Sequence, residues 1–541
     1  TAVEGLLSMA VLKDKCLPQT THQRIEHIHE SLLFYDEHTF GASESVSDPL
    51  CENSQVQWGE KSAYAWEAVK RTQMLYETSV GLLQGDLRRG KNPTLTIFNT
   101  LNWKRSEMLT VYIDFEVIPR NQFFEITDFQ GHSLKVQPIR YRKEGCYYAI
   151  FAEDIPPMGY KTFEIVFKQP STDTGTITIN NASIENHFYK LQLNPDKGTI
   201  QSLYDKELNC ELVDSSSPWE LGAFIYEKLG NRDQLAQYRL DDYNRTGLSE
   251  CRIIDSSNGP IYQRILLQGK SPGTDEAFGV NLEIKLYHDT KRIELEYAIK
   301  RLPETDPSGI YVAFPFQLPE GKLAFDVQGG TVISGKNQLE GTSTDWNTVQ
   351  NFVSVQNNQA QIIIGSSLIP LYQLGDINLG KFQYQKQYDR PHVYSWVMNN
   401  YWNTNFKASQ EGEFRWSYHL TSSVDPSNNL ATKFGWSSRI PLYARVMPTG
   451  TENHKPTEYS AFHFEKDNFL MTSCTPSKEE GYILLNIREI DGKRTNLRIL
   501  NEDGQTVPFT IVNAIEEKLE NETSEHIFEG YQNKFIKIKR F

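Results

Sequence analysis

The chain has 541 residues, of which 38% are hydrophobic and 23% are charged. At about 150 residues per domain, this length predicts roughly three to four domains, and the composition excludes a disordered chain. Lys and Arg number 55 while Asp and Glu number 69, so the formal charge of −14 argues against nucleic acid or an anionic membrane as a partner. No apolar run approaches the roughly 18 residues of a membrane helix, and no membrane insertion is expected.

The first ninety residues have helical periodicity. Thr21 is placed to cap a helix whose apolar positions recur every three or four residues, and a second helical run ends near Gly85. We expect a small helical bundle over residues 1–90. The chain begins at Thr1 inside what resembles a structured segment, so we expect it to be a fragment of a longer protein or a processed chain.

From residue 92 the hydrophobic period changes from 3.6 to 2, which is typical of strands. The alternation is clearest over residues 280–286 and 293–297, with a turn at 288–291 between them, and it predicts a β-hairpin. No segment alternates strands with helices. The sequence therefore predicts a mainly β fold with an N-terminal helical bundle and several antiparallel β-sandwiches.

The predicted domains are a helical bundle (1–90), a small β-sandwich (91–170), a large β-supersandwich (178–432) and a C-terminal β domain (433–541). The polar stretch 421–432 is interpreted as a linker before the last domain. The basic tail 534–541 alternates lysines with Phe535, Ile536 and Ile538, and it is interpreted as an edge strand protected by lysines.

Several chemical motifs match only in part. The six cysteines are scattered, with no spacing typical of a zinc ribbon or a small disulfide framework. Residues 330–336 have the Gly and Lys spacing of a phosphate loop, but Asn337 replaces the Ser or Thr, and a β-turn is expected instead. Residues 41–45 lack the last Gly of a nucleophile elbow. His27 and His29 point about 200° apart on a helix and cannot share a metal.

The segment 32–42 is a stronger candidate than these motifs. In it Asp36, Glu37 and His38 directly follow an apolar run, and small residues come soon after them. Imidazole beside carboxylates is ligand chemistry that zinc favours. A single histidine in an acidic tripeptide is more often a hydrogen-bonded core residue. One ligand does not make a metal site, so the residues alone leave both interpretations open.

Residues 35–42, Tyr-Asp-Glu-His-Thr-Phe-Gly-Ala, resemble the YDEHTWGA signature of glycoside hydrolase family 38, the retaining zinc-dependent α-mannosidases. Other segments are similar to family motifs and occur in the family's order, namely the helix with Gln57, Trp58 and Lys61, and the segments 184–189, 197–208, 308–316 and 398–406. The chain is thus identified as the C-terminal region of such an enzyme. This implies a large antiparallel supersandwich similar to galactose mutarotase.

The resemblance implies that His38 is a zinc ligand. The other ligands, the nucleophile and the general acid come in this family from an N-terminal α/β barrel, which this sequence does not contain, so no catalytic residue is expected in the chain and the isolated chain is expected to be inactive. Thr39 stands where some branches have a sugar-binding Asp. Tyr311 corresponds to a strand tyrosine that reaches toward the sugar, although a buried strand tyrosine is the alternative.

A retaining mechanism needs two carboxyl groups roughly 5–5.5 Å apart, and zinc on the sugar hydroxyls would favour a distorted ring. Trp396, Tyr401 and Trp402 could offer apolar faces to a sugar or pack in a β core. The implied partner is an α-mannoside or another glycan, with homo-oligomerisation left open and no compartment indicated. The alternative function is a non-catalytic carbohydrate-binding or structural β-sandwich protein.

Overall fold

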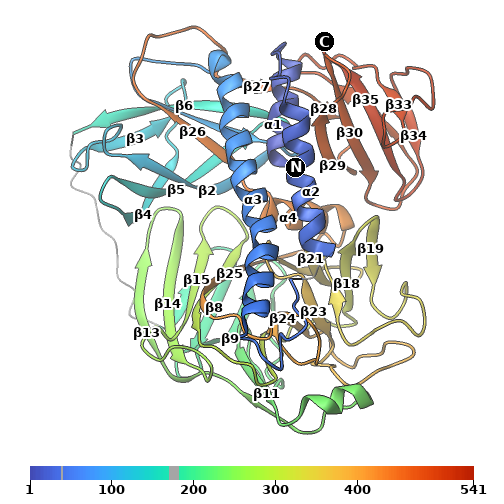
Figure 1. Ribbon diagram of the computed structural model, residues 1–541. Helices are drawn as coiled ribbons and strands as arrows, with labels where there is room; N and C mark the ends of the chain where they lie inside the picture. The colour runs from blue at the N-terminus through green and yellow to red at the C-terminus, as the bar shows by residue number, and fades with distance from the viewer. Residues whose placement is uncertain (38–39, 170–181) are drawn as a thin grey trace. The chain divides into compact units, whose positions relative to one another are not determined.

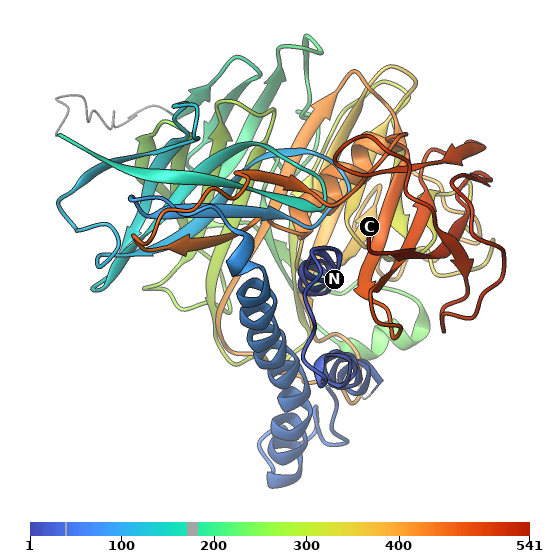
Figure 2. The same ribbon diagram turned by 90° about the horizontal axis from the view of Figure 1, so that it is seen from above.

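The computed structural model describes residues 1–37, 40–169 and 182–541 and is shown in Figures 1 and 2. The chain divides into two compact units. The first comprises Thr1–Leu33, Ala65–Gly175 and Ile440–Phe541, and the second comprises Phe34–Tyr64 and Thr176–Arg439. Antiparallel sheets dominate both units, which confirms the predicted mainly β fold with N-terminal helices. None of the helices in the described residues is both long enough and apolar enough to cross a membrane.

Among the residues that the structure describes, three α-helices precede the sheets: α1 (Ala2–Leu12), α2 (Thr21–Glu37) and α3 (Glu52–Leu83). The short 3-10 helix η1 (Gln84–Asp86) follows them. The expected helix start near Thr21 and the helix end near Gly85 are confirmed. The predicted capping role of Thr21 is wrong, because Thr21 is the first residue of α2 and its buried hydroxyl has no hydrogen-bond partner among the described residues. In the first unit, Val3 and Leu7 of α1 pack with Ile28 of α2 and with Ala68 and Leu75 of α3. These apolar contacts hold the three helices together.

Two sheets of the first unit enclose one apolar core. A five-stranded sheet is ordered β26-β1-β6-β27, with β3 also paired to β6, and a three-stranded sheet is ordered β2-β5-β4. Leu95 and Phe163 of the first sheet and Leu109 and Ile150 of the second belong to the shared core. The strands are β1 (Thr94–Asn99), β2 (Arg105–Asp114), β3 (Phe123–Thr127), β4 (Lys135–Tyr141), β5 (Gly145–Ile155), β6 (Gly159–Lys168), β26 (Tyr443–Met447) and β27 (Glu458–Ser460).

The last strands of the first unit form a four-stranded sheet, β29-β30-β35-β33, and two two-stranded sheets, β28-β32 and β31-β34. Helix α1 packs on β29 and β30, and both views show it beside these strands (Figures 1 and 2). The strands are β28 (His463–Phe464), β29 (Phe469–Pro476), β30 (Tyr482–Glu489), β31 (Thr495–Leu497), β32 (Ile499–Leu500), β33 (Thr510–Val512), β34 (His526–Phe528) and β35 (Asn533–Lys539).

The expectation that the basic tail is an edge strand is wrong. Strand β35 pairs with β30 on one side and with β33 on the other. Ile536 and Ile538 are fully buried in the core of this sheet, while Lys537 pairs with Glu479 and Glu516. The carboxylates of neighbouring segments therefore neutralise the lysine that the sequence suggested was facing solvent.

The described residues of the second unit form three antiparallel sheets. They are a four-stranded sheet β10-β9-β8-β7, a six-stranded sheet β12-β11-β17-β24-β23-β20 and a nine-stranded sheet β13-β14-β15-β16-β25-β22-β21-β18-β19. The strands of the first two are β7 (Ser183–Glu185), β8 (Tyr189–Asn194), β9 (Thr199–Asp205), β10 (Cys210–Glu211), β11 (Phe224–Leu229), β12 (Tyr243–Thr246), β17 (Ser308–Phe314), β20 (Asn347–Thr348), β23 (Leu371–Leu374) and β24 (Val393–Asn399). The 3-10 helix η2 (Arg232–Gln237) connects β11 to β12.

The nine-stranded sheet contains the predicted hairpin as β15 and β16, with Leu282 opposite Tyr297. Its side chains share one core with the six-stranded sheet, so the two sheets form a sandwich. The strands are β13 (Ser249–Asn258), β14 (Tyr262–Lys270), β15 (Val280–Tyr287), β16 (Ile293–Arg301), β18 (Lys322–Val327), β19 (Gly330–Ile333), β21 (Phe352–Gln356), β22 (Gln361–Gly365) and β25 (Gly412–Ser423).

Strand β17 is buried on both faces, so Tyr311 lies in a different apolar cluster from its neighbours Ile310 and Val312. Ile310, Val312 and Phe314 point into the sandwich core, whereas Tyr311 and Ala313 point to a second cluster rich in aromatic residues. Because side chains alternate along a strand, the whole strand appears apolar in the sequence. The second cluster is where the motif residues described below meet.

The interpretation of residues 421–432 as a linker is wrong. Residues 421–423 complete β25, and helix α4 (Asn428–Arg439) begins five residues later. Leu430, Ala431 and Phe434 of this helix pack with Phe352 and Ile363. Two polar residues of the helix, Asn429 and Thr432, are buried as well. Residues 330–333, in contrast, form β19 and are followed by a turn, as expected for a segment that is not a phosphate loop.

Candidate functional site

The candidate site is centred on the signature segment, residues 35–42. His38 and Thr39 lie outside the described residues, so the role of His38 as a metal ligand stays a prediction. Helix α2 ends at Glu37, and the rings of Tyr35 and Phe40 lie 5.9 Å apart. This ring contact brings the two described flanks of the segment together.

The second half of the signature segment is bound to a distant loop. The Ala42 amide donates a hydrogen bond to the Asn405 carbonyl at 2.7 Å, and Gly41 forms a β-bridge with Phe406. The Ser45 hydroxyl lies 2.7 Å from the Ala42 carbonyl oxygen and 3.0 Å from the Asn405 carbonyl oxygen. Two segments that the sequence singled out separately are thus in direct contact.

Gly41 is required by this close approach. A Cβ atom at position 41 would lie 2.5 Å from the Asn405 carbonyl oxygen, well inside van der Waals contact. The Gly41 carbonyl accepts a hydrogen bond from the Lys61 ammonium group on α3. The lysine noted in the sequence as part of a family-like helix therefore holds the signature segment from its other side.

A second lysine lies over aromatic rings next to the segment. The Lys407 ammonium nitrogen is 5.9 Å from the ring centre of Phe40 and 5.2 Å from that of Trp58 on α3. Cation–π contacts of this kind contribute about 0.5–1 kcal/mol each at exposed sites. They connect residue 40 to the loop that also carries Asn405.

This loop, residues 400–408, is anchored by Asn400. Its carboxamide donates to the carbonyls of Glu304 and Ala408 at 3.0 and 2.8 Å, and its oxygen accepts from the Ser308 amide at 2.7 Å. Three of the four hydrogen bonds available to an amide side chain are thereby used on backbone groups. The loop conformation is fixed by these bonds at the start of β17.

Tyr401, the next residue, reaches a buried carboxylate. Its hydroxyl donates to Glu227 Oε1 at 2.6 Å, and the Tyr311 hydroxyl lies 3.3 Å from the same oxygen. Arg245, opposite Glu227 in the β11–β12 pair, donates to the other carboxylate oxygen. Glu227 is fully buried, and its charge is compensated by this arginine and two hydroxyl groups.

The electrostatics of this cluster keep both hydroxyl groups protonated. Burial, together with the Glu227 carboxylate, raises the pKa of Tyr311 well above its usual range. Burial, reinforced by Tyr311 and Glu227, raises the pKa of Tyr401 in the same way. Both side chains therefore act as hydrogen-bond donors, and neither is prepared to act as a base.

The other aromatic candidates pack around this cluster. The Trp396 ring stacks on Tyr311 with centres 5.9 Å apart and 1° between planes, and it contacts Tyr401 and Trp402. Trp396 and Tyr401 are buried, whereas Trp402 is half-buried. Tyr311 itself is fully buried, so its role in binding sugar stays a prediction that rests on the resemblance.

Among residues 1–37, 40–169 and 182–541, no group of three or more His, Cys, Asp or Glu side chains is arranged to hold a metal ion. The exposed carboxylates of Asp36 and Glu37 directly precede position 38 in the sequence. The described residues therefore do not make a zinc site by themselves.

Sequence reasoning missed Glu227 and Arg245. The available signal was a glutamate inside the apolar strand Phe-Ile-Tyr-Glu-Lys-Leu, with an arginine in the next strand. A charge in such a position requires a partner, because an unpaired buried carboxylate is very costly. The pattern indicates a partner but does not identify the tyrosines.

Residues 184–382 match the family described as "Glycosyl hydrolases family 38 C-terminal domain". This match confirms the resemblance to the family that the sequence motifs indicated. A search among curated proteins finds no match.

Two solved structures from Enterococcus faecalis are similar over 99% of this chain. An alpha-mannosidase from strain V583 has a TM-score of 0.76 and 13% identity, and a protein in glycosyl hydrolase family 38 has a TM-score of 0.73 and 13% identity. At this identity the similarity shows a shared fold. The chain spans 65% of the length of the first protein and 68% of that of the second.

Proposed function

We propose that this chain is the C-terminal part of a retaining, zinc-dependent α-mannosidase that hydrolyses α-mannosides in glycans. The observation that carries the proposal is the contact between the signature segment and the 400–408 loop, through Ala42 and Asn405. Two of the sequence motifs with family resemblance, residues 35–42 and 398–406, meet at this contact. A merely structural β protein has no need to hold an acidic, histidine-containing segment in this way.

In this proposal, His38 is one zinc ligand, and the remaining ligands and the two catalytic carboxyl groups belong to a separate α/β domain. Zinc, when bound, would polarise the sugar hydroxyls. The chain's own residues position the signature segment: Lys61 and the Asn405 carbonyl hold Gly41 and Ala42 from two sides. Tyr311, which hydrogen bonds with Glu227 and Tyr401 hold in place, is proposed to orient the sugar-binding surface.

The surface of α3 in the first unit supports a further domain packing here. Trp66, Val69 and Met74 are 71%, 61% and 57% exposed, and their spacing places them on one side of the helix. Large apolar side chains gathered on one side of a helix mark an interaction surface. We assign it to the catalytic domain, which would correspond to the part of the longer Enterococcus proteins that this chain does not span.

The proposal is tested by assaying this chain, and the same chain joined to its preceding coding sequence, against an aryl α-mannoside with added zinc. We expect no turnover from this chain alone and turnover from the longer protein. Equal activity in both would contradict the placement of the catalytic carboxyl groups. A well-folded longer protein without activity would favour the non-catalytic alternative, a carbohydrate-binding or structural β-sandwich protein.

A further inference from the structure

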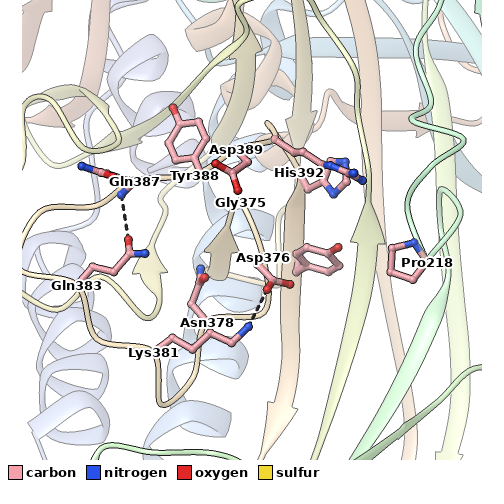
Figure 3. A pocket seen from close by; sticks show the side chains of 12 residues that line it. Pro218, Gly375, Asp376, Asn378, Lys381, Gln383, Gln387, Tyr388, Asp389 and His392 are labelled. Atoms are coloured by element: carbon pink, nitrogen blue, oxygen red, sulfur yellow. Dashed lines mark hydrogen bonds and ion pairs between the residues drawn. The ribbon is translucent and has the colours of Figure 1, made fainter.

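The second unit contains a cavity of about 360 Å³ that is separate from the signature segment. It is formed by the loop 375–392 together with Pro218 and Tyr394, and Figure 3 shows its lining side chains. A volume of this size is at the lower end of the roughly 300–1,000 Å³ range for small-molecule sites. The cavity therefore suits a small ligand.

The cavity wall is held by the buried polar network described above. Gln373 donates to the Tyr311 hydroxyl at 3.3 Å and accepts a hydrogen bond from the Asn378 backbone amide at 2.5 Å. The Asn378 side chain donates to the Leu374 carbonyl at 2.8 Å, which leaves its own oxygen for a ligand. Hydrogen bonds from Glu227 through Tyr311 thus fix a residue that lines the cavity.

Both cations of the cavity are already paired. Lys381 binds Asp376 at 2.7 Å, and Arg390 lies 3.3 Å from Asp214, which also contacts His392 Nε2 at 3.0 Å. Burial lowers the pKa of His392 in spite of the neighbouring Asp214, so the ring is neutral near pH 7. The cavity therefore offers no free positive charge to an anionic ligand.

Groups able to bind hydroxyls remain available. In the described part of the chain, Asp389 has no ion pair or hydrogen bond, and its side chain is one of those that line the cavity (Figure 3). The Gln383 oxygen accepts from the Gln387 amide at 2.9 Å, so its amide hydrogens are free. Tyr388 is held against Gly375, where a Cβ would meet the tyrosine Cβ at 2.4 Å.

We propose that this cavity is a second, non-catalytic carbohydrate-binding site for an uncharged hexopyranoside. Adjacent sugar hydroxyls both donate and accept hydrogen bonds, which matches the Asp389 carboxylate, the Gln383 amide and the Asn378 oxygen. The C–H face of a pyranose can pack on the rings of Tyr388 and Tyr394. Only the choice of a mannoside as the probe rests on the proposed function.

The test is titration of this chain with methyl α-D-mannopyranoside, measured by calorimetry and by saturation-transfer NMR. We expect saturable binding that is weakened at least tenfold by Asp389→Ala and by Gln383→Ala. The matched control is Asp196→Ala, an exposed aspartate in a turn of the same unit, which should bind as the unchanged chain does. The thermal unfolding midpoint of each variant checks that it is folded.

Two results would overturn the proposal: no binding up to the highest usable mannoside concentration, or binding that the cavity variants leave unchanged. The variant His38→Ala should bind normally. A loss of binding in this variant alone would place the sugar at the signature segment instead. Because the readout is binding and not hydrolysis, failure here leaves the proposed function to its own assay.

Discussion

The backbone amide of Ala42 donates a 2.7 Å hydrogen bond to the carbonyl of Asn405, and this bond joins the signature segment to the 400–408 loop. Gly41, Lys61 and Ser45 contribute further contacts at the same junction. The junction fixes residues 40–42, which begin two positions after the proposed metal ligand. The proposed role of His38 therefore requires this junction to be intact.

Replacing Gly41 by alanine should break this junction. The added methyl group would lie 2.5 Å from the Asn405 carbonyl oxygen, which is backbone and cannot move aside cheaply. We expect a loss of about 1–3 kcal/mol in the free energy of unfolding, measured by urea denaturation. The matched control is Gly59→Ala on α3, where a new Cβ meets nothing within 4 Å.

The Gly59→Ala control should stabilise the chain by up to about 1 kcal/mol, because alanine favours a helix interior. If both alanine variants had the same stability, the close approach of Gly41 to Asn405 would not exist in solution.

Removing the Tyr401 hydroxyl should destabilise the Glu227 cluster. Tyr401→Phe deletes a 2.6 Å hydrogen bond to a fully buried carboxylate, and such bonds to charged groups are worth about 1.5–3 kcal/mol. Tyr311→Phe, which removes a 3.3 Å contact, should cost less. Denaturation of the two single variants and the double variant measures their coupling, and strictly additive costs would contradict a shared carboxylate acceptor.

Acid should destabilise the second unit through His419. Burial and the nearby Arg292 lower the pKa of His419 to about 3, although Glu294 opposes them, so the folded chain keeps the ring neutral. In the unfolded chain this histidine binds a proton below about pH 6.5. Because the folded chain does not bind that proton, the free energy of unfolding falls by about 1.4 kcal/mol for each pH unit between about pH 6.5 and 3.

His419→Gln should flatten the pH dependence of unfolding in this window, measured by denaturation at a series of pH values. The exposed His187 offers a matched control as His187→Gln, which should keep the dependence of the unchanged chain. An unchanged slope in His419→Gln would show that the ring is accessible to protons in the folded state.

The exposed side of α3 gives a prediction about assembly. In the longer protein with its preceding coding sequence, Val69→Glu should lower mannosidase activity at least tenfold, because a charge would enter the proposed interface. In this chain alone the same change should leave the free energy of unfolding nearly unaltered, since Val69 is 61% exposed. Gln23→Glu, on the exposed surface of α2, is the control. Full activity of the Val69 variant would place the catalytic domain elsewhere.

Local patterns predicted the elements that depend on local physics. The β15–β16 hairpin follows from alternation of apolar residues, and α2 follows from apolar residues at helical spacing. Helix α4 was missed because its polar residues outnumber the few that pack on Phe352 and Ile363. Strand β35 was misplaced because a strand's own sequence does not show how many neighbours it has.

The candidate site was only partly predictable for the same reason. Resemblance selected residues 35–42, Lys61, Tyr311 and 398–406 one by one. Their contacts, such as Gly41 with Phe406, are long-range and leave no local pattern. The Glu227–Arg245 pair needed the register of β11 and β12, which the sequence does not specify.

The central claim is that His38 contributes to a zinc site in an α-mannosidase. Its most direct test is the zinc content of the longer protein after dialysis, measured by atomic emission for the unchanged chain, His38→Ala and the control His27→Ala. We predict one zinc per chain in the unchanged protein and in His27→Ala, and little zinc in His38→Ala. Equal zinc in all three proteins, or none in the unchanged one, would contradict the claim.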